Sequence, residues 1–281
     1  MRVDAHQHFW SFNLASYAWI DESMQVLRRD YLPPALHQEL NAHAFDGSVA
    51  VQARQTLEES LWLLSLAAER PYIKGVVGWV DLCAATVQVE LERLAAYPKF
   101  RGVRHIAQSE PDDFLLRPAF QRGIAALERF ALAYDILIYP HQLEAACALA
   151  ARFPRQRFVL DHLGKPRIRQ RELKPWRARL RQLSRLPNVW CKLSGLVTEA
   201  ELSLWKPVDL LPYLDVALEC FGPTRLLFGS DWPVCLLAAP YSDVLAVVED
   251  YTARLSLAER AAILGDNAVR FYGLELSVGR T

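Results

Sequence analysis

Short apolar runs that alternate with amphipathic segments constrain this 281-residue chain more than any other feature. A strand followed by a helix and another strand forms a βαβ unit, whose strands lie parallel in one sheet. In the amphipathic segment 56–70, for example, Leu57, Leu61 and Leu64 share one helical face. The predicted strands are 2–6, 47–52, 73–80, 101–106, 136–141, 157–162, 188–194 and 225–231. The predicted helices are 56–70, 86–96, 118–133, 143–153, 174–186, 208–221, 241–255 and 256–272.

Eight strand–helix units in a chain of this length fit a closed (β/α)8 TIM barrel better than an open doubly wound sheet. The chain contains neither a GxGxxG motif nor a P-loop, which are the usual reasons to prefer the open sheet. No Gly/Ser-rich or Pro-rich linker divides it. We therefore expect one α/β barrel domain over residues 1–281, with an extra C-terminal helix over residues 256–272.

Charge and composition exclude several classes of protein. Lys and Arg number 32, and so do Asp and Glu, whereas nucleic-acid binding depends on an excess of positive charge. Between residues 152 and 187 there are twelve basic residues and two acids, which we interpret as a solvated surface because no nucleic-acid motif accompanies them. No apolar run reaches 18 residues, and the first residues are too polar for a secretory signal. Five scattered cysteines are typical of reduced thiols, so we expect a cytoplasmic protein.

Histidines gather at the ends of the predicted strands. In a parallel barrel these ends meet at one mouth, which holds the active site. Two histidines that alternate in a strand face the same side, where they can bind a divalent metal or donate hydrogen bonds to an oxyanion. Asp231 ends the eighth strand at the same mouth. The five histidines placed in this way are His6, His8, His105, His141 and His162.

Several segments that carry these residues resemble the amidohydrolase superfamily, and within it the amidohydrolase-2 family and its sugar-lactonase branch of L-fucono- and L-rhamnonolactonases. Together they run from residue 4 to residue 273. The resemblance implies a distorted (β/α)8 barrel that hydrolyses an ester or amide. The segments are DAHQHFW from Asp4, GVRH from Gly102, LDHLGKP from Leu160, KLSGL from Lys192, LFGSDWP from Leu227 and GDNAVRFYG from Gly265.

The resemblance also implies a set of site residues. It carries metal-ligand positions over to His6, His8 and Asp231, with His141 as the candidate from the fifth strand and His162 from the sixth. Strand 4 ends in Arg104 and His105 instead of a lysine that could be carbamylated, which argues against a binuclear site. The sugar-lactonase branch often works without a bound metal. We therefore expect no strictly required cofactor, with a single zinc or other divalent ion as the alternative.

The expected reaction is hydrolysis of a neutral aldonolactone, derived from L-fucose or L-rhamnose, to the free aldonic acid. Ester hydrolysis needs a base for water, donors for the oxyanion and an acid for the leaving hydroxyl. We assign Asp231 as base and later acid, and His6, His8 and His162 as donors. Asp231 could instead cap the following helix. A serine nucleophile is a weaker alternative, because Ser194 and Ser230 lack the GxSxG elbow.

Substrate contacts are expected from polar and aromatic residues near the strand ends, although each tryptophan could equally pack in the core. The runner-up functions are a zinc-dependent decarboxylase or ester hydrolase of the amidohydrolase-2 family and a pyrone-dicarboxylate lactonase, which would need more arginines at the mouth. The expected partner is a small sugar lactone, with neither nucleic acid nor membrane. The sequence does not distinguish a monomer from a homo-oligomer. The candidate substrate-binding residues are Trp10, Gln52, Trp79, Arg104, His105, Tyr139, His141, Lys165 and Trp232.

Overall fold

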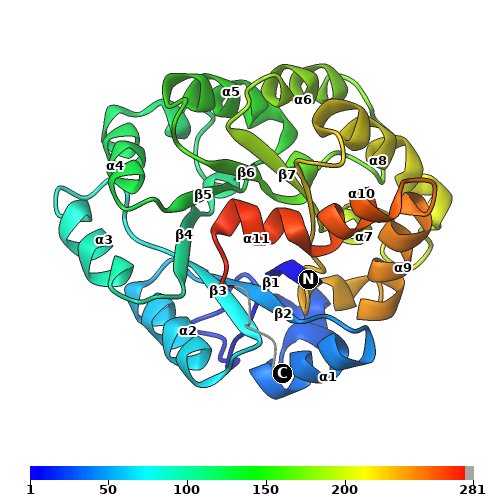
Figure 1. The fold of residues 1–281 in the computed structure, drawn as a ribbon, viewed down its shortest axis with the longest axis horizontal. Coiled ribbons are helices and arrows are strands. Elements are labelled where there is room, and N and C mark those ends of the chain that lie inside the picture. Colours follow the sequence, from blue (N-terminus) through cyan, green and yellow to red (C-terminus); the bar gives the residue numbers. More distant parts are fainter. Residues whose placement is uncertain (276–281) are drawn as a thin grey trace.

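The computed structural model describes residues 1–275, in which eight parallel strands form one sheet in chain order (Figure 1). The sheet curls into a (β/α)8 barrel, as predicted. Residues 276–281, which the one-domain expectation includes, lie outside the described residues. The strands are β1 (Val3–Gln7), β2 (Gly47–Val51), β3 (Ile73–Gly78), β4 (Phe100–His105), β5 (Ala133–Ile136), β6 (Phe158–Leu160), β7 (Val189–Leu193) and β8 (Leu226–Phe228).

Helices surround the barrel and shield its outer face from water (Figure 1). The segment α1, which the periodicity did not reveal, begins with two prolines, residues that suit the first turn of a helix. Among the described residues, none of the helices is long and apolar enough to span a membrane. The helices are α1 (Pro33–Ala42), α2 (Leu57–Glu69), α3 (Val87–Ala95), α4 (Pro118–Arg129), α5 (Leu143–Arg152), α6 (Trp176–Ser184), α7 (Leu196–Glu199), α8 (Pro207–Phe221), α9 (Tyr241–Thr252), α10 (Leu257–Ala261) and α11 (Asn267–Tyr272).

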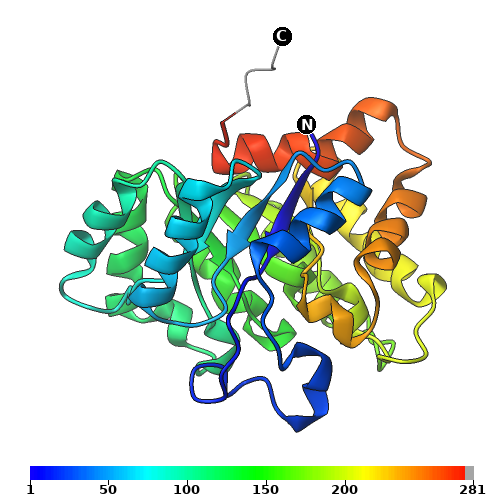
Figure 2. The same ribbon diagram turned by 90° about the horizontal axis from the view of Figure 1, so that it is seen from below.

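The C-terminal helix α11 plugs one end of the barrel. Figure 2 shows it lying across the end where the N-terminus enters, so the opposite end is the open mouth. Its apolar side chains join the small and β-branched residues of the barrel interior, which removes them from water. This interior cluster consists of Val3, Ala5, Val49, Val51, Val77, Ala133, Val159, Leu227, Ala268, Phe271, Tyr272 and Leu274.

The barrel closes between β8 and β1 by side-chain and loop contacts. In the described part of the chain, β8 and β1 do not form a continuous ladder of backbone hydrogen bonds, and a single β-bridge between Gln7 and Trp232 joins them instead. The buried Asp4 carboxylate accepts from the Ser230 backbone N–H (2.9 Å), the Ser230 hydroxyl (2.6 Å) and the His6 backbone N–H (3.1 Å). The Asp231 backbone N–H then donates to the His6 carbonyl at 2.8 Å. Asp4 thus holds together the two segments that carry His6 and Asp231.

Two predicted segments were wrong in their bounds. The strand predicted at 136–141 is β5 at Ala133–Ile136, because its register follows β4, where Gly102 pairs with Ala133 and His105 with Ile136. Helix α4 therefore ends at Arg129 rather than at residue 133. Pro140, which lacks the N–H that an interior strand needs, begins a 3-10 turn instead.

The predicted helix 256–272 is interrupted. It consists of α10, a π-helical turn over Ala262–Asp266, and α11. A Cβ at Gly265 would lie 1.9 Å from the Met1 carbonyl oxygen, so the N-terminal segment passes directly against this turn. The close approach requires a glycine and a local change of helical pitch.

We predict that Ser230→Ala lowers the free energy of unfolding by about 1–3 kcal/mol, because it leaves one oxygen of the buried Asp4 without its hydroxyl donor. Urea unfolding followed by circular dichroism measures this change. The exposed Ser242 provides the control, and Ser242→Ala is expected to stay within about 0.5 kcal/mol of the parent. Equal losses in the two variants would contradict the assignment of Asp4 and Ser230 as the closing contact.

Candidate active site

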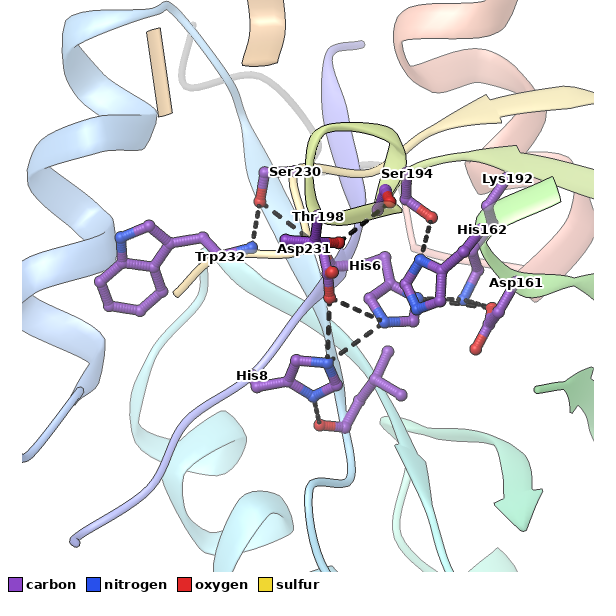
Figure 3. Close-up of polar contacts among 12 residues, drawn as sticks. His6, His8, Asp161, His162, Lys192, Ser194, Thr198, Ser230, Asp231 and Trp232 are labelled. Atoms are coloured by element: carbon purple, nitrogen blue, oxygen red, sulfur yellow. Dashed lines mark hydrogen bonds and ion pairs between the residues drawn. The ribbon is translucent and has the colours of Figure 1, made fainter. Parts of the chain in front are cut away.

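Three polar atoms from β1 and the end of β8 converge at the mouth (Figure 3). The Nε2 atoms of His6 and His8 are 3.2 Å apart, and they lie 3.6 Å and 3.4 Å from Oδ1 of Asp231. All three residues are almost completely buried. The structure therefore brings together the two histidines and the carboxylate that the sequence analysis assigned to the mouth.

His162 joins this cluster from the turn after β6. Its ring centroid lies 4.6 Å from that of His6, and its Nδ1 is 2.9 Å from the Ser194 hydroxyl. A Cβ at Gly195 would come within 2.5 Å of His162 Nδ1, so the ring packs directly on the glycine backbone. His8 is held in a similar way, because its Nδ1–H donates to the Val51 carbonyl at 2.8 Å.

Strained backbone accompanies the cluster. His162, Leu163 and Asp231 have φ values of 52°, 55° and 59°, in the left-handed region that non-glycine residues rarely adopt. Such conformations cost roughly 1–2 kcal/mol for each residue and persist where the surrounding structure enforces them, often at functional sites. Here they direct His162 and Asp231 toward the same point.

A layer of buried charges lies beneath the histidines, and the sequence analysis did not identify it. The Lys192 ammonium on β7 is 2.5 Å from Asp135 Oδ2, 2.9 Å from Asp161 Oδ1 and 3.0 Å from His6 Nδ1. Arg104 on β4 donates to Asp161 Oδ2 at 3.1 Å and to the Gln52 carbonyl. All of these charged groups are inaccessible to water or nearly so, so each depends on its partners.

The signal that could have revealed this layer is a charge inside an apolar strand. Alternate strand residues face the same side of a sheet, so Asp135 follows the interior residue Ala133, and Asp161 follows Val159. Lys192 interrupts the apolar strand Val189–Leu193 in the same way. The sequence analysis treated the segments of Asp161 and Lys192 as strands and as marks of family resemblance, and it left Asp135 outside the predicted strand 136–141.

Electrostatics differ between the two layers. Burial opposes ionisation of Asp231, but His162, His8 and His6 outweigh it and hold the pKa of Asp231 below its ordinary range. Burial lowers the pKa of His162 to about 4. In the lower layer, burial raises the pKa of Asp135 to about 6, whereas Lys192 and His6 overcome burial and hold the pKa of Asp161 well below its ordinary range. At neutral pH the mouth therefore contains an ionised Asp231 among neutral imidazoles.

Two groups of three residues have the composition of a metal site: His6, His8 and Asp231, and His6, Asp161 and His162. In the first group the donor atoms are 3.2–3.6 Å apart, close to the spacing of ~3.4 Å between ligands of a tetrahedral zinc with bonds of about 2.0–2.1 Å. The first group therefore fits one zinc ion. In the second group Asp161 already contacts the Lys192 and Arg104 cations, which leaves less negative charge for a metal.

The predicted ligand His141 is not part of either group. Because β5 ends at Ile136, His141 lies on the following 3-10 turn, where half of its side chain is exposed and pairs with Asp112 at 3.1 Å. The structure therefore does not place His141 among the possible metal ligands, contrary to the prediction.

Two of the predicted aromatic contacts lie elsewhere. Trp10 is fully buried, and its indole N–H donates to the Arg29 carbonyl at 2.9 Å within the segment that follows β1. Trp232 packs against Phe9 and Tyr31, and Figure 3 shows its ring directed away from the three histidines. These two tryptophans pack in the core, the alternative weighed from the sequence.

Three other residues predicted to contact the substrate already form hydrogen bonds or ion pairs with neighbouring protein residues. His105 ends β4 and pairs with Glu110 at 3.0 Å, while its Nδ1 accepts from the Trp79 indole at 3.3 Å. Gln52 is fully buried, and its amide donates to the Arg104 carbonyl at 3.3 Å.

A cavity of about 460 Å³ includes three of the predicted contacts, Tyr139, His141 and Lys165. Lys165 lies 3.4 Å from Glu199, which also lines the cavity and which the sequence analysis did not name. Burial raises the pKa of Glu199, and the Asp231 carboxylate adds to that rise, so the cavity is within electrostatic reach of the mouth. Neither Asp231 nor any of the three histidines of the cluster lines the cavity itself.

The fold and the cluster define a (β/α)8 barrel with histidines and an aspartate at its open mouth. A family model described as Amidohydrolase matches residues 3–274. The chain belongs to the amidohydrolase family, and it is an enzyme of that family.

The chain is similar to two L-fucono-1,5-lactonases. One, from Burkholderia multivorans, is 46% identical over 98% of this chain and 96% of the relative. The other, from Burkholderia ambifaria, is 37% identical over 99% of this chain and 97% of the relative. A crystal structure of an amidohydrolase from Burkholderia multivorans with bound zinc has a TM-score of 0.94 and 46% identity, and it covers 98% of this chain and 100% of that one.

Proposed function

We propose that the protein hydrolyses a neutral sugar-acid lactone, and L-fucono-1,5-lactone is the first candidate. The observation that carries the proposal is the buried Asp231 carboxylate opposite His6 and His8 at the barrel mouth. The similarity to two L-fucono-1,5-lactonases over nearly the whole chain supports the same reaction class. L-rhamnonolactone is the second candidate, since the chain is also 24% identical to an L-rhamnono-gamma-lactonase over half its length.

In the proposed mechanism Asp231 is the base. Its lowered pKa keeps it ionised at neutral pH, so it can take a proton from a water molecule that attacks the lactone carbonyl. His6 and His162 lie beside the position where negative charge develops on the carbonyl oxygen and polarise it. His8, assigned as a donor from the sequence, donates from Nδ1 to the Val51 carbonyl, so its neutral ring offers a lone pair to the attacking water instead. When the tetrahedral intermediate collapses, Asp231 returns the proton to the ring oxygen, which leaves as a hydroxyl group.

Zinc can be accommodated in the same cluster. His6, His8 and Asp231 would hold the ion, and a similar amidohydrolase has been solved with bound zinc. Bound zinc would polarise the carbonyl and lower the pKa of its water to about 7. We propose that the reaction does not require it, because Asp231 and the three histidines already supply a base and polarising groups.

The paired charges that line the cavity favour a neutral substrate over an anionic one. Arg167 and Arg169 line it in addition to Lys165, but Arg167 lies 3.5 Å from Glu172 and Arg169 lies 2.6 Å from Glu201. Each cation is thus matched by a carboxylate, and a substrate with several negative charges would have to displace these partners. Hydroxyl groups of a sugar lactone can instead bind alongside them.

Acid release from a panel of lactones tests the proposal. L-fucono-1,5-lactone, L-rhamnono-γ-lactone and 2-pyrone-4,6-dicarboxylate would be compared with a pH indicator. We expect the highest kcat/KM for a neutral sugar lactone. Turnover of the dicarboxylate alone would overturn the proposed substrate class.

We predict that Asp231→Asn lowers kcat by about 10²–10⁴-fold, because an amide cannot take the proton of water. Circular dichroism should show an unchanged fold. Asp112→Asn changes an exposed aspartate that pairs with His141, and it serves as the matched control with nearly full activity. Equal activity of the Asp231 variant and the parent would remove Asp231 from the mechanism.

The pH dependence separates the two modes of water activation. Asp231 stays ionised above a pKa that lies below its ordinary value, and His162 stays neutral above a pKa of about 4. We therefore expect kcat/KM at pH 5 to lie within about twofold of its value at pH 7. A zinc-bound water with a pKa of about 7 would instead make kcat/KM fall by about tenfold per pH unit below 7.

Metal removal provides a further prediction. After exhaustive chelation, with zinc content checked by elemental analysis, we expect the protein to retain its lactonase activity. Loss of all activity on chelation and its return with zinc would show that the metal is required.

A further inference from the structure

A row of hydrogen bonds runs through His6 on β1 and His8, which follows the end of that strand. The Lys192 ammonium lies 3.0 Å from Nδ1 of His6, Nε2 of His6 lies 3.2 Å from Nε2 of His8, and Nδ1 of His8 lies 2.8 Å from the Val51 carbonyl oxygen. At one end stands a group that can only donate, and at the other a group that can only accept. The two ends therefore determine the direction of the whole row.

One arrangement of protons satisfies all three contacts. Lys192 donates to Nδ1 of His6, so the single proton of that neutral ring is on Nε2. The Val51 carbonyl requires the proton of His8 on Nδ1, which leaves a lone pair on Nε2 of His8. The middle contact is then a hydrogen bond from His6 Nε2–H to His8 Nε2.

The opposite arrangement of His6 is less favourable. A proton on Nδ1 could point to Asp161 Oδ1 at 3.4 Å, and Nε2 could accept from Arg104 at 3.3 Å. That N–H would then face the Lys192 ammonium at 3.0 Å, donor against donor. The proposed arrangement also brings two donors together, because the N–H of His6 lies 3.3 Å from Nη1 of Arg104. This contact is longer than the one with Lys192, and Arg104 already donates to Asp161 and to the Gln52 carbonyl.

We propose that Lys192 is a positioning residue that fixes the tautomer of His6, and that the two histidines at the mouth therefore have opposite roles. His6 presents an N–H, which suits the oxygen of a lactone carbonyl. His8 presents a lone pair, which suits the hydrogen of a water or hydroxyl group. The assignment of these two roles to catalysis rests on the proposed function, whereas the tautomers themselves do not.

The same arrangement opposes zinc. A zinc ion held by both histidines through Nε2 needs a lone pair on each of these atoms, so the proton of His6 would have to move to Nδ1. There it would face the ammonium of Lys192. Lys192 thus weakens zinc binding at a cluster whose spacing otherwise suits the ion.

Nitrogen NMR of the metal-free protein labelled with ¹⁵N-histidine tests the tautomers directly. Signals of His6 and His8 are assigned by comparison with His6→Gln and His8→Gln variants. We expect His6 to be protonated on Nε2 and His8 on Nδ1. A proton on Nδ1 of His6 in the parent protein would overturn the proposal.

Zinc affinity in Lys192→Met provides the second test. Without the ammonium, His6 can donate from Nδ1 to Asp161, so we expect its tautomer to change and zinc to bind about 10- to 100-fold more tightly in chelator competition. Asp135→Asn is the matched control, because it removes another partner of Lys192 but keeps the contact with His6. In Asp135→Asn, the tautomer of His6 and the zinc affinity should match those of the parent protein.

Lys192→Met leaves the buried Asp135 without a cation, whereas Asp161 keeps Arg104. The double variant Lys192→Met/Asp135→Asn is therefore used if circular dichroism shows that the single variant does not fold. Unchanged zinc affinity and an unchanged His6 tautomer in the folded variant would overturn the proposal. Neither readout involves lactone turnover. A protein that hydrolyses no lactone can still show these tautomers, and an active lactonase can fail to show them.

Discussion

The Lys192 ammonium must be neutralised inside the barrel, and much of the site depends on how this is done. A buried ammonium without partners is far too costly, so Asp135 and Asp161 must reach it from the two preceding strands. This requirement fixes how β5, β6 and β7 are positioned along the barrel axis relative to one another. It also places Asp161 directly below His6 and His162, where its charge influences both rings. The lower layer thus supports the residues at the mouth.

Closure at β8 and β1 brings the remaining part of the site into place. These two strands are the least regularly paired in the barrel, and Asp4 joins them through three donors. Asp231 follows immediately in a left-handed conformation, and its backbone is bonded to His6. The candidate base and the candidate donors therefore come from the two segments that Asp4 holds together.

Sequence patterns predicted the barrel because eight alternating units leave few other folds, and the mouth because strand ends must converge there. His6, His8 and Asp231 lie within the first and last of these units, and the structure brings them together. The patterns failed at β5, because Tyr134 and Asp135 interrupt the apolar pattern of the real strand and Pro140 lies within the predicted one. The strand was therefore predicted too far along the chain, and His141 was wrongly assigned to its end. They also failed for Trp10 and Trp232, because local apolarity does not tell a pocket wall from a core. Lys192, Asp135 and Asp161 were missed because their partners lie on different strands.

The C-terminal helix α11 has a consequence for the order in which the enzyme is completed during synthesis. Tyr272 donates to Asp135 at 2.8 Å and closes the lower end of the interior cluster. A nascent chain that has emerged from the ribosome as far as β8 and Asp231 contains every strand and every proposed catalytic residue. Such a chain still lacks the Tyr272 hydroxyl group, which helps to hold Asp135 beside Lys192. It also lacks the apolar side chains of α11 that plug the barrel below this layer. The charged layer is therefore completed only when α11 has been translated, well after Asp231.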